Sequence, residues 1–596
     1  MKLLRLKITD PDGFRSLPYG FEHHFRTEWS LQNELAQREG FAPFVCAGPN
    51  GSGKSNLLEV LAAIFFQLEV LRVRRSFLPE VLQSEALDFS PVAFELDYLI
   101  RLPAEYRGPD SPEWAKVGVW KNAGKSVRFQ WENQSDFDTD VYEAFKGDHA
   151  DILLPQSVVA YSSGENEILS LPFFKTRFVQ FDEYWNALIR QLPYPGHPET
   201  RLAYLDNGFS QAILLCNLLF QDDATLQPYC EDVGIESLKE FRIILRRSIP
   251  VTRQQIAAFT SGDYVSPTET QDGRFADTNA VYLDPETGDY RLNLLQGLEA
   301  NERTERTAIV EKFKRCATVY FHDEKSDTLI LDYRVNENTK AAFRANFDDS
   351  ALSLFQALQV LIALNLYSVS DKLKSDLYIS TSHYVSETVP TLASDERIMR
   401  IKNFYFRKRN VEKPMLLKEL SDGEHQLLHS LGLCLLFRGT NSLFLFDEPE
   451  THFNPDWRAS FISRLRQCLP DTGKVGQEML ITTHSPFLIS DSMPDKVLVF
   501  AKGEDSRTVH VSHPKYNTLG ASINKITMNT FDKRETIGGR AQALLDDLRR
   551  SFEQGAENKE ALITKIHQQF GDSVEKVLLI DAILASESQG SGEEQH

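Results

Sequence analysis

The sequence predicts an α/β fold with a core sheet, an antiparallel β lobe and additional helices. A glycine-rich octet at 48–55 stands between an apolar run at 41–46 and a helical pattern of apolar residues at 56–71. Two later apolar runs, at 442–446 and 479–483, are typical of buried strands and end in carboxylates and in a histidine. Alternating apolar and polar residues after the first helix predict the antiparallel strands.

The octet matches the phosphate-binding pattern G-x-x-x-x-G-K-[ST] at every fixed position. Its glycines let backbone N–H groups turn towards phosphate oxygens, and the start of the next helix adds partial positive charge. Lys54 is expected to reach the β- and γ-phosphates, and the Ser55 hydroxyl to bind Mg²⁺. A strand-to-helix turn without a ligand is the alternative, but the complete octet and its two flanks favour binding of ATP with Mg²⁺. The expected nucleotide contacts here are Gly48, Pro49, Asn50, Gly51, Ser52, Gly53, Lys54, Ser55 and Asn56.

The polar residues at the two later strand ends supply the remaining groups that phosphoryl transfer requires. Asp447 is expected to complete the Mg²⁺ shell. Glu448 is placed to polarise a water for attack on the γ-phosphate. His484, at the end of the other strand, is expected to sense or stabilise that phosphate. The expected catalytic residues are therefore Glu448 and His484.

The composition is typical of a soluble cytoplasmic protein. Of the 596 residues, 42% are hydrophobic and 25% are charged. No stretch approaches the roughly 18 consecutive apolar residues of a membrane span. The six cysteines are scattered and form no C-x-x-C pair, which suits a reducing compartment and argues against a zinc site. Because the net charge is −20, contact with nucleic acid needs a local basic patch.

Four regions are expected along the chain. They are an N-terminal lobe at 1–170, a mostly helical insertion at 171–316, a C-terminal lobe at 317–505 and a helical C-terminal region at 506–596. Lys54 and Asp447 stand far apart in the sequence, which indicates that a segment is inserted between two lobes of one unit. Helices are expected at 184–192, 209–220, 235–247, 540–552, 559–570 and 573–585, followed by disorder at 586–596.

Three further stretches accompany the octet, namely LSDGE at 420–424, DEPE at 447–450 and TTHSP at 482–486. Together they resemble the ABC-type ATPase family, and more narrowly its SMC, RecF and OLD-like branch. The resemblance covers about residues 1–165 and 317–505 and implies an ABC-type ATPase head. In that family the signature stretch binds the γ-phosphate held by the opposite subunit, so two heads form a homodimer around ATP. The resemblance implies such trans contacts for Ser421, Asp422, Gly423 and Glu424, although Asp422 replaces the commoner glycine.

The same resemblance extends to three isolated positions. Phe14-Arg15-Ser16 resembles the N-F-R-S element of RecF and SMC heads, which makes Arg15 an expected neighbour of a phosphate or base. Gln156 is the candidate for the glutamine that touches Mg²⁺ in that family. Asn454-Pro455 resembles the loop that crosses the dimer interface.

A narrower resemblance rests on the segments 161–167, 519–522 and 535–539. They are similar to segments of the ATPase subunits of Septu systems, and of retrons that pair an ATPase with an HNH endonuclease. This resemblance implies a regulatory ATPase of a bacterial anti-phage defence complex, which holds a separate HNH-type nuclease effector. The amphipathic pattern at 559–570 offers an apolar stripe that could dock such a partner or pack on the head.

Two alternatives remain open. A RecF- or SMC-like ATPase of DNA repair or chromosome maintenance would show DNA-stimulated hydrolysis without a partner nuclease. An OLD-type nuclease would need a cluster of metal-binding carboxylates in the same chain after His484. The candidates Asp546, Asp547 and Asp581 fall within helical patterns, where carboxylates usually form a solvated face.

Nucleic acid, either DNA or a retron RNA–DNA, is a further expected partner. Basic side chains are interleaved with aromatic ones at 397–409, and two more basic groups lie at 312–315 and 242–253. Such side chains can bind phosphates and stack on bases. A solvated strand with an aromatic inner face is an equal alternative. The residues concerned are Arg397, Arg400, Lys402, Phe404, Tyr405, Phe406, Arg407, Lys408 and Arg409, then Lys312, Lys314 and Arg315, and finally Arg242, Arg246, Arg247 and Arg253.

Overall fold

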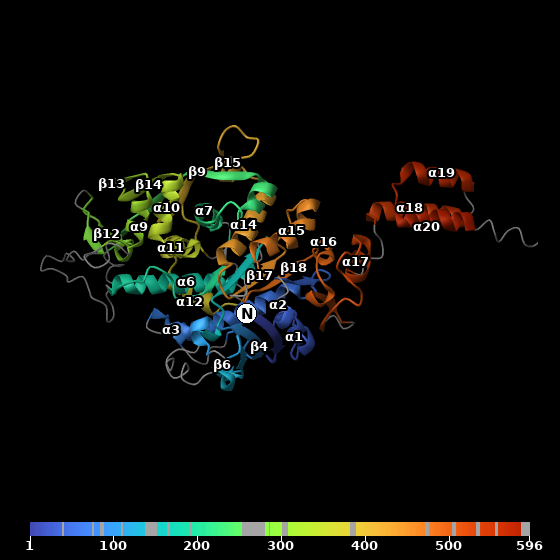
Figure 1. The fold of residues 1–596 in the computed structure, drawn as a ribbon, viewed down its shortest axis with the longest axis horizontal. Helices are drawn as coiled ribbons and strands as arrows, with labels where there is room; N and C mark the ends of the chain where they lie inside the picture. The colour runs from blue at the N-terminus through green and yellow to red at the C-terminus, as the bar shows by residue number, and fades with distance from the viewer. Residues whose placement is uncertain are drawn as a thin grey trace, which may run out of the picture.

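A computed structural model gives the fold of the chain (Figure 1). It describes residues 1–37, 41–73, 77–83, 89–108, 111–137, 152–163, 167–190, 192–204, 206, 208–252, 280–284, 287–300, 308–381, 389–470, 476–503, 508–531, 537–554 and 558–585. The expectations for Arg253 and for disorder at 586–596 lie outside these residues.

A seven-stranded sheet of order β20-β19-β3-β18-β17-β7-β8 forms the core. Neighbouring strands run parallel from β19 to β8, and β20 pairs antiparallel with β19. The carboxyl ends of the parallel strands therefore meet at one edge of the sheet, where open α/β sheets usually bind ligands. The strands are β3 (Phe44–Ala47), β7 (Ser157–Ser162), β8 (Leu202–Tyr204), β17 (Ser442–Asp447), β18 (Glu478–Thr483), β19 (Val497–Lys502) and β20 (Val509–Ser512).

The apolar runs of the sequence form these core strands because both faces of the sheet are covered. Alternate residues of β17 point to opposite sides, with Leu443 and Leu445 in one buried cluster and Phe444 and Phe446 in another. The first cluster includes the apolar face of α2 (Lys54–Arg72), and the second includes that of α14 (Asp422–Phe437). The sheet is thus a middle layer, as Figure 1 shows for α2, β17 and α14.

An antiparallel sheet of order β2-β1-β4-β5-β6 packs on the far side of α2. Its strands supply buried residues to the same cluster as α2 and the core sheet. Three of them occur where the alternating pattern predicted antiparallel strands, so that prediction is confirmed. The strands are β1 (Lys2–Ile8), β2 (Glu22–His24), β4 (Phe94–Arg101), β5 (Trp114–Lys121) and β6 (Arg128–Trp131).

A second antiparallel sheet of order β13-β14-β9-β15-β16 lies beyond α14, with a three-stranded sheet of order β10-β12-β11 next to it (Figure 1). The strands of the larger sheet are β9 (Ile235–Arg246), β13 (Val319–Asp323), β14 (Thr328–Arg334), β15 (Met399–Lys408) and β16 (Met415–Leu416). The strands of the smaller sheet are β10 (Ser248–Val251), β11 (Val281–Leu283) and β12 (Tyr290–Asn293).

The expected helix at 235–247 is wrong, because this stretch forms β9. Leu238, Phe241 and Leu245 are buried, and their spacing of three and four residues imitates a helical stripe. The stretch forms a strand because it pairs with β14 on one side and β15 on the other, and its β-branched residues also favour a strand.

In its described residues, the segment 171–316 is therefore not a mostly helical insertion. Its β8 completes the core sheet, its β9 is the central strand of the second sheet, and α6 (Glu167–Ile189) crosses the expected boundary at 170. The other helices of this part of the protein pack around the three larger sheets. They are α1 (Glu28–Gln37), α3 (Glu80–Gln83), α7 (Ser210–Phe220), α9 (Ile309–Cys316), α10 (Glu337–Asn346), α11 (Ala351–Ala363), α12 (Asp371–Ile379), α15 (Pro455–Cys468) and α16 (Pro486–Ser490).

One helical stretch, Ala351–Ser368, is long and apolar enough to cross a membrane by length and composition alone. A membrane span was not expected from the sequence, because no stretch approaches about 18 consecutive apolar residues. Half of the helical stretch is buried inside the protein, and Leu354, Leu358 and Leu361 lie in the cluster shared with α14. A core helix of a soluble protein passes the same test, so this stretch is weak evidence for a membrane span.

Four helices lie in the described part of the C-terminal region, and the last three occur where the sequence predicted them, whereas the first was not predicted. They are α17 (Ile523–Thr530), which packs on α16, followed by α18 (Gly539–Glu553), α19 (Lys559–Gln569) and α20 (Val574–Ala585). The last three share a hydrophobic cluster of their own and lie side by side in Figure 1. Leu562 and Ile566 of α19 are buried in that cluster, so the predicted apolar stripe packs within the chain.

Candidate nucleotide-binding site

The loop that follows β3 requires glycine at two positions. Gly48 has φ of 145°, and a Cβ there would lie 2.3 Å from the Phe500 carbonyl oxygen. Gly53 has φ of 98°, and a Cβ there would lie 2.8 Å from Ser16 Oγ. Other residues are strained in these conformations and would also collide with their neighbours. The loop therefore brings its backbone close to the start of α2, where helix N–H groups favour an anion.

Lys54 is buried at the first position of α2. Its Nζ donates hydrogen bonds to the carbonyl oxygens of Gly48 and Pro49, each at 3.1 Å. Burial lowers the pKa of Lys54, while the carboxylates of Glu448 and Asp447 act in the opposite direction. The ammonium group is thus held against the inside of the loop, where it can counter the charge of a polyphosphate.

Two strands and one helix bring oxygen atoms together beside the loop. Ser55 Oγ donates a hydrogen bond of 2.8 Å to Asp447 Oδ1, as the motif predicted for two Mg²⁺ ligands. Thr482 Oγ1, at the end of β18, donates to the same oxygen at 2.6 Å. Hydroxyl and carboxylate oxygens are suitable Mg²⁺ ligands, so Ser55 and Asp447 fit the ion. Thr482 was not among the residues predicted for the site, although it precedes His484 within the TTHSP stretch.

Glu448 and His484 form a half-exposed pair next to these oxygens. His484 Nε2 lies 3.3 Å from Glu448 Oε1. The hydrogen bond from His484 is the largest influence on the pKa of Glu448 and lowers it, so the carboxyl group is ionised at neutral pH. Glu448 has φ of 47°, and its N–H donates to Thr482 Oγ1 at 3.0 Å, which fixes this unusual backbone. An ionised carboxylate beside a phosphate-binding loop can accept a proton from a water.

Gln156 does not lie near these groups, so its prediction as a Mg²⁺ ligand is wrong. It precedes β7, and its Oε1 accepts a hydrogen bond of 2.8 Å from the backbone N–H of Asn441, just before β17. Because β7 and β17 run parallel in register, this is the end of the sheet opposite to Asp447. Ser163 reaches the site instead. Its N–H donates to the Asp447 carbonyl at 3.2 Å, and its hydroxyl bonds to the Glu448 carbonyl.

Arg15 is also placed away from the loop. Its guanidinium donates to the Thr381 carbonyl, lies 3.7 Å from Glu59 and lines a cavity of about 120 Å³. The neighbouring Ser16 makes the contact with α2, donating a hydrogen bond of 2.5 Å to Asn56 Oδ1. Asn56 Nδ2 in turn donates to Glu59 at 3.0 Å. The side chains of Arg15 and Asn56 thus have partners within the protein, while the backbone of Asn56 remains in the first turn of α2, next to Ser55.

The signature stretch forms the exposed start of α14. Ser421 is the N-cap, accepting from the Glu424 N–H at 3.3 Å, while Glu424 Oε2 accepts from the Ser421 N–H at 2.8 Å. Glu424 also forms an ion pair with Lys408, so its side chain stabilises this helix end and is not free to meet a phosphate. Gly423 is required because a Cβ would lie 2.7 Å from the His452 carbonyl oxygen. Ser421 and Asp422 are exposed.

Glu450, two residues after Glu448, is a buried carboxyl group with no role predicted from the sequence. Burial is the largest influence on its pKa and raises it to about 7. Thr483 Oγ1 donates a hydrogen bond to Glu450 Oε1, whereas Oε2 has no hydrogen-bond partner among the described residues.

Asn454 caps α15 by accepting from the Trp457 N–H at 2.8 Å, as its place before Pro455 suggests.

Comparison with known proteins bears on this site. Residues 312–490 match the protein family described as "AAA domain, putative AbiEii toxin, Type IV TA system". The matched range contains the signature stretch, Asp447, Glu448 and His484, whereas the phosphate-binding loop lies outside it.

A curated relative and two solved structures are also similar to parts of the chain. Protein ea59 of Escherichia phage lambda is 26% identical over 173 residues, 28% of this chain and 32% of that protein. The chain thus spans about a third of the length of this relative. An SMC head bound to the C-winged helix domain of ScpA is 11% identical, with 86% and 97% of the two chains covered and a TM-score of 0.31. The SMC head domain from Thermotoga maritima is 10% identical, with 87% and 100% covered and a TM-score of 0.27. These TM-scores are too low to define the fold, which follows from the sheet topology described above.

Proposed function

We propose that this chain binds ATP with Mg²⁺ at the loop after β3 and hydrolyses it to ADP and phosphate. The observation that carries the proposal is the meeting of Ser55 Oγ and Asp447 Oδ1 at 2.8 Å, beside Lys54 and the Glu448–His484 pair. These groups come from distant parts of the sequence and converge at one edge of the core sheet. Their types and places match what phosphoryl transfer to water requires.

Each side chain has a distinct part in this reaction. Lys54 counters the charge of the β- and γ-phosphates, and Ser55 and Asp447 would hold the metal ion, which neutralises developing charge on the phosphate oxygens. Glu448 orients a water and accepts its proton as the water oxygen bonds to the γ-phosphorus. The bond from the γ-phosphorus to the bridging oxygen breaks, and ADP leaves with that oxygen. His484 hydrogen-bonds to Glu448 and keeps it ionised for this step.

We further propose that the active form is a homodimer with ATP between two heads. Ser421 and Asp422 are exposed at the start of α14, where helix N–H groups attract an anion. A second copy of the chain would bring its bound γ-phosphate to this helix end. Each site would then combine Lys54 of one copy with Ser421 of the other.

Complementation between two inactive variants tests the dimer. Lys54→Ala and Ser421→Arg each inactivate both sites of a homodimer, but a mixed dimer has one site with Lys54 and Ser421 intact. Equal mixing with free exchange should restore about a quarter of the normal hydrolysis rate, because half of the dimers are mixed. Two Lys54→Ala preparations mixed together are the control. Formation of mixed dimers, seen by native mass spectrometry, without recovery of activity would contradict the shared site.

At a finer level, we propose that the ATPase holds and regulates a separate HNH-type nuclease in a bacterial anti-phage defence complex. The Septu- and retron-like segments support this role. The matched family supports it as well, because its description includes "putative AbiEii toxin, Type IV TA system". Asp546 and Asp547 bond to Gln542 and Arg550 on their own helix, an arrangement typical of a solvated face.

The test of this role compares the purified chain with the chain co-expressed with the nuclease encoded beside it. DNA and RNA cleavage should require the second protein and should change with ATP. Cleavage by the chain alone that disappears in Asp546→Asn or Asp581→Asn would support the OLD-type alternative instead. DNA-stimulated hydrolysis together with no bound nuclease would support the RecF- or SMC-like alternative.

A further inference from the structure

The sheet of order β13-β14-β9-β15-β16 has one buried face and one open face. Leu331 of β14, Ile243 of β9 and Met399 of β15 point towards the helices and belong to the main hydrophobic cluster. In Figure 1 the labelled helices α7, α9, α10 and α11 lie on one side of these strands. We call the opposite side, formed by the alternate residues of each strand, the outer face.

The strand register shows which side chains share the outer face, because residues paired across antiparallel strands point the same way. One row of partners runs from Phe321 through Ile330 and Ile244 to Arg400. The next rows are Val319, Asp332, Arg242 and Lys402, then Arg334, Glu240 and Tyr405, and on the other side Asp323, Thr328 and Arg246. The register therefore gathers basic residues that stand about 160 positions apart in the sequence.

Most cations of the outer face have no carboxylate partner among the residues that the structure describes. Within the described residues, Arg242 is paired, at 2.6 and 2.8 Å, with Asp332 beside it. Arg400 instead donates to Ser394 Oγ at 3.2 Å and Arg246 to the Asp395 carbonyl at 3.5 Å. The described part of the chain contains no ion pair for Arg246, Arg334, Arg400 or Lys402. The protein has a net charge of −20, so a face with unpaired cations is a local exception that attracts a polyanion.

Apolar side chains border these cations at the edge of the sheet. Phe321 and Val319 of β13 are 62% and 58% exposed, and Tyr405 is partly exposed in β15. An aromatic ring on an open surface next to cations offers a base a stacking partner while its phosphate meets a guanidinium or ammonium group. The face spans three strand spacings from β13 to β15, which is about 14 Å.

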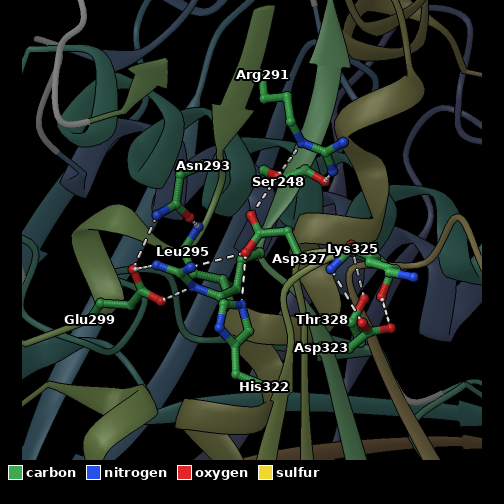
Figure 2. A network of polar contacts seen from close by, with 12 residues as sticks. Ser248, Arg291, Asn293, Leu295, Glu299, His322, Asp323, Lys325, Asp327 and Thr328 are labelled. Carbon is green, nitrogen blue, oxygen red and sulfur yellow. Dashed lines mark hydrogen bonds and ion pairs between the residues drawn. The ribbon is translucent and has the colours of Figure 1, made fainter. Parts of the chain in front are cut away.

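The strand that carries Phe321 is anchored firmly despite its exposed position. Asp327, in the turn between β13 and β14, accepts hydrogen bonds from Arg247 Nη1 at 2.9 Å and from Ser248 Oγ at 2.6 Å, and lies 2.9 Å from His322 Nε2 (Figure 2). Arg247 also pairs with Glu299 at 2.5 Å. Arg247 is therefore a structural member of this network and not available to a phosphate, unlike Arg246 on the outer face.

We propose that the outer face binds a single strand of nucleic acid, with its phosphates on Arg246, Arg400 and Lys402 and a base stacked on Phe321. A single strand fits because its bases are free to lie on an open sheet, whereas a duplex hides them. The proposal does not depend on ATP hydrolysis, since none of these residues belongs to the nucleotide-binding site.

Anisotropy of a labelled oligonucleotide of 20 residues, with the full chain as binder, tests the proposal. Arg400→Glu with Lys402→Glu should weaken binding at least tenfold and lower the slope of log affinity against log salt by about 1.4, the value for two contacts to a single strand. Arg549→Glu with Arg550→Glu on α18 makes the same change of charge at exposed positions and should leave affinity nearly unchanged. Equal loss in both double variants, or no loss in the first, would overturn the proposal.

Phe321 supplies a second test that does not alter charge. Phe321→Ala should weaken binding about fivefold or more, and Phe321→Trp should restore it. Single-stranded DNA and RNA of one sequence, with the matching duplex, complete the assay, and tighter binding of the duplex would refute the single-strand proposal. Sedimentation without nucleic acid shows whether Phe321→Ala changes the oligomeric state, which would assign this edge to a second copy of the chain instead. Unchanged ATP hydrolysis in each variant shows that the fold and the proposed ATPase are intact.

Discussion

Polar groups are arranged in opposite ways at two places, the edge of the core sheet that carries the proposed nucleotide site (the nucleotide edge) and the outer face of the second sheet. At the nucleotide edge the groups are already joined to one another, Ser55 to Asp447 and Glu448 to His484. On the outer face, Arg400 and Lys402 have no carboxylate partner within the described residues. Chemistry on one bond requires groups held in fixed positions. Attraction of a polyanion requires only a surplus of charge, which acts over the length of a binding face.

Loss of Glu448, the proposed catalytic carboxylate, should give the largest effect and should separate the two regions. Glu448→Gln keeps the shape of the side chain but cannot accept a proton, so hydrolysis should fall by about 100-fold or more while ATP still binds. Lys54→Ala should abolish ATP binding itself, because the buried countercharge is lost. Steady-state hydrolysis and binding of a fluorescent ATP analogue measure the two effects.

Glu412→Gln, at an exposed position, is the matched control and should hydrolyse ATP at the normal rate. Both Glu448→Gln and Lys54→Ala should bind a single-stranded oligonucleotide as the unaltered chain does. Normal turnover by Glu448→Gln would remove Glu448 as the proton acceptor. Loss of oligonucleotide binding in either variant would show that the two regions are coupled.

The backbone of the phosphate-binding loop should be the next most sensitive feature. Gly48→Ala combines a strained φ with a Cβ 2.3 Å from the Phe500 carbonyl oxygen, and we expect a loss of about 2–3 kcal/mol in the free energy of unfolding. Gly20→Ala is the matched control, because Gly20 also has positive φ but a Cβ there would meet nothing within 4 Å. The control should lose about 1 kcal/mol from strain alone.

Urea denaturation of both glycine variants measures this difference. Gly48→Ala should lose more free energy of unfolding than Gly20→Ala, and the difference reports the close approach of β19 to the loop. Equal losses in the two variants would mean that the loop moves away from Phe500 at little cost. The outer face has no glycine among its paired rows, so no similar effect is expected there.

The sequence could predict most of the nucleotide edge, because local patterns determine it. The strand–loop–helix around the octet and the strands that end at Asp447 and His484 follow from local patterns, because each motif directly adjoins its own strand. The pairing of Ser55 with Asp447 also follows, since motif chemistry places a hydroxyl and a carboxylate on one ion. Thr482 was missed because its role depends on the register of β17 against β18, which places it beside Asp447.

Three of the failed predictions depended on tertiary arrangement. The helix expected at 235–247 is the strand β9, because pairing with β14 and β15 outweighs the helical spacing of its apolar residues. Gln156 was chosen for its residue type near β7, but the direction of that strand places it at the opposite end of the sheet. The side chain of Arg15 turns to Glu59 and the Thr381 carbonyl, and residues so distant in sequence give no local signal. The outer face shows the same limit, since basic residues at 242–246 and 400–402 become neighbours only through the register.

Substitution of Glu450 should give the smallest of these effects, a change in the free energy of unfolding that depends on pH. The pKa of Glu450 is raised by burial from 4.5 in the unfolded chain to about 7 in the folded protein. The folded state therefore binds this proton more tightly than the unfolded state. The contribution of Glu450 to stability is complete below pH 4.5, decreases as the pH rises towards 7 and is constant above that value.

Glu450→Gln removes this dependence because an amide stays neutral throughout. From pH 5 to pH 8 the variant should gain stability relative to the unaltered protein by an amount on the order of 1–3 kcal/mol. Urea denaturation at several pH values measures the gain, and Glu412→Gln, an exposed carboxyl group, should show none. Thr483 can donate its hydroxyl to the oxygen of either side chain, so the hydrogen bond at this position is kept. Parallel stability curves of Glu450→Gln and the unaltered protein between pH 5 and 8 would mean that Glu450 is ionised in the folded protein. Its Oε2, which has no partner among the described residues, would then need a stabilising contact.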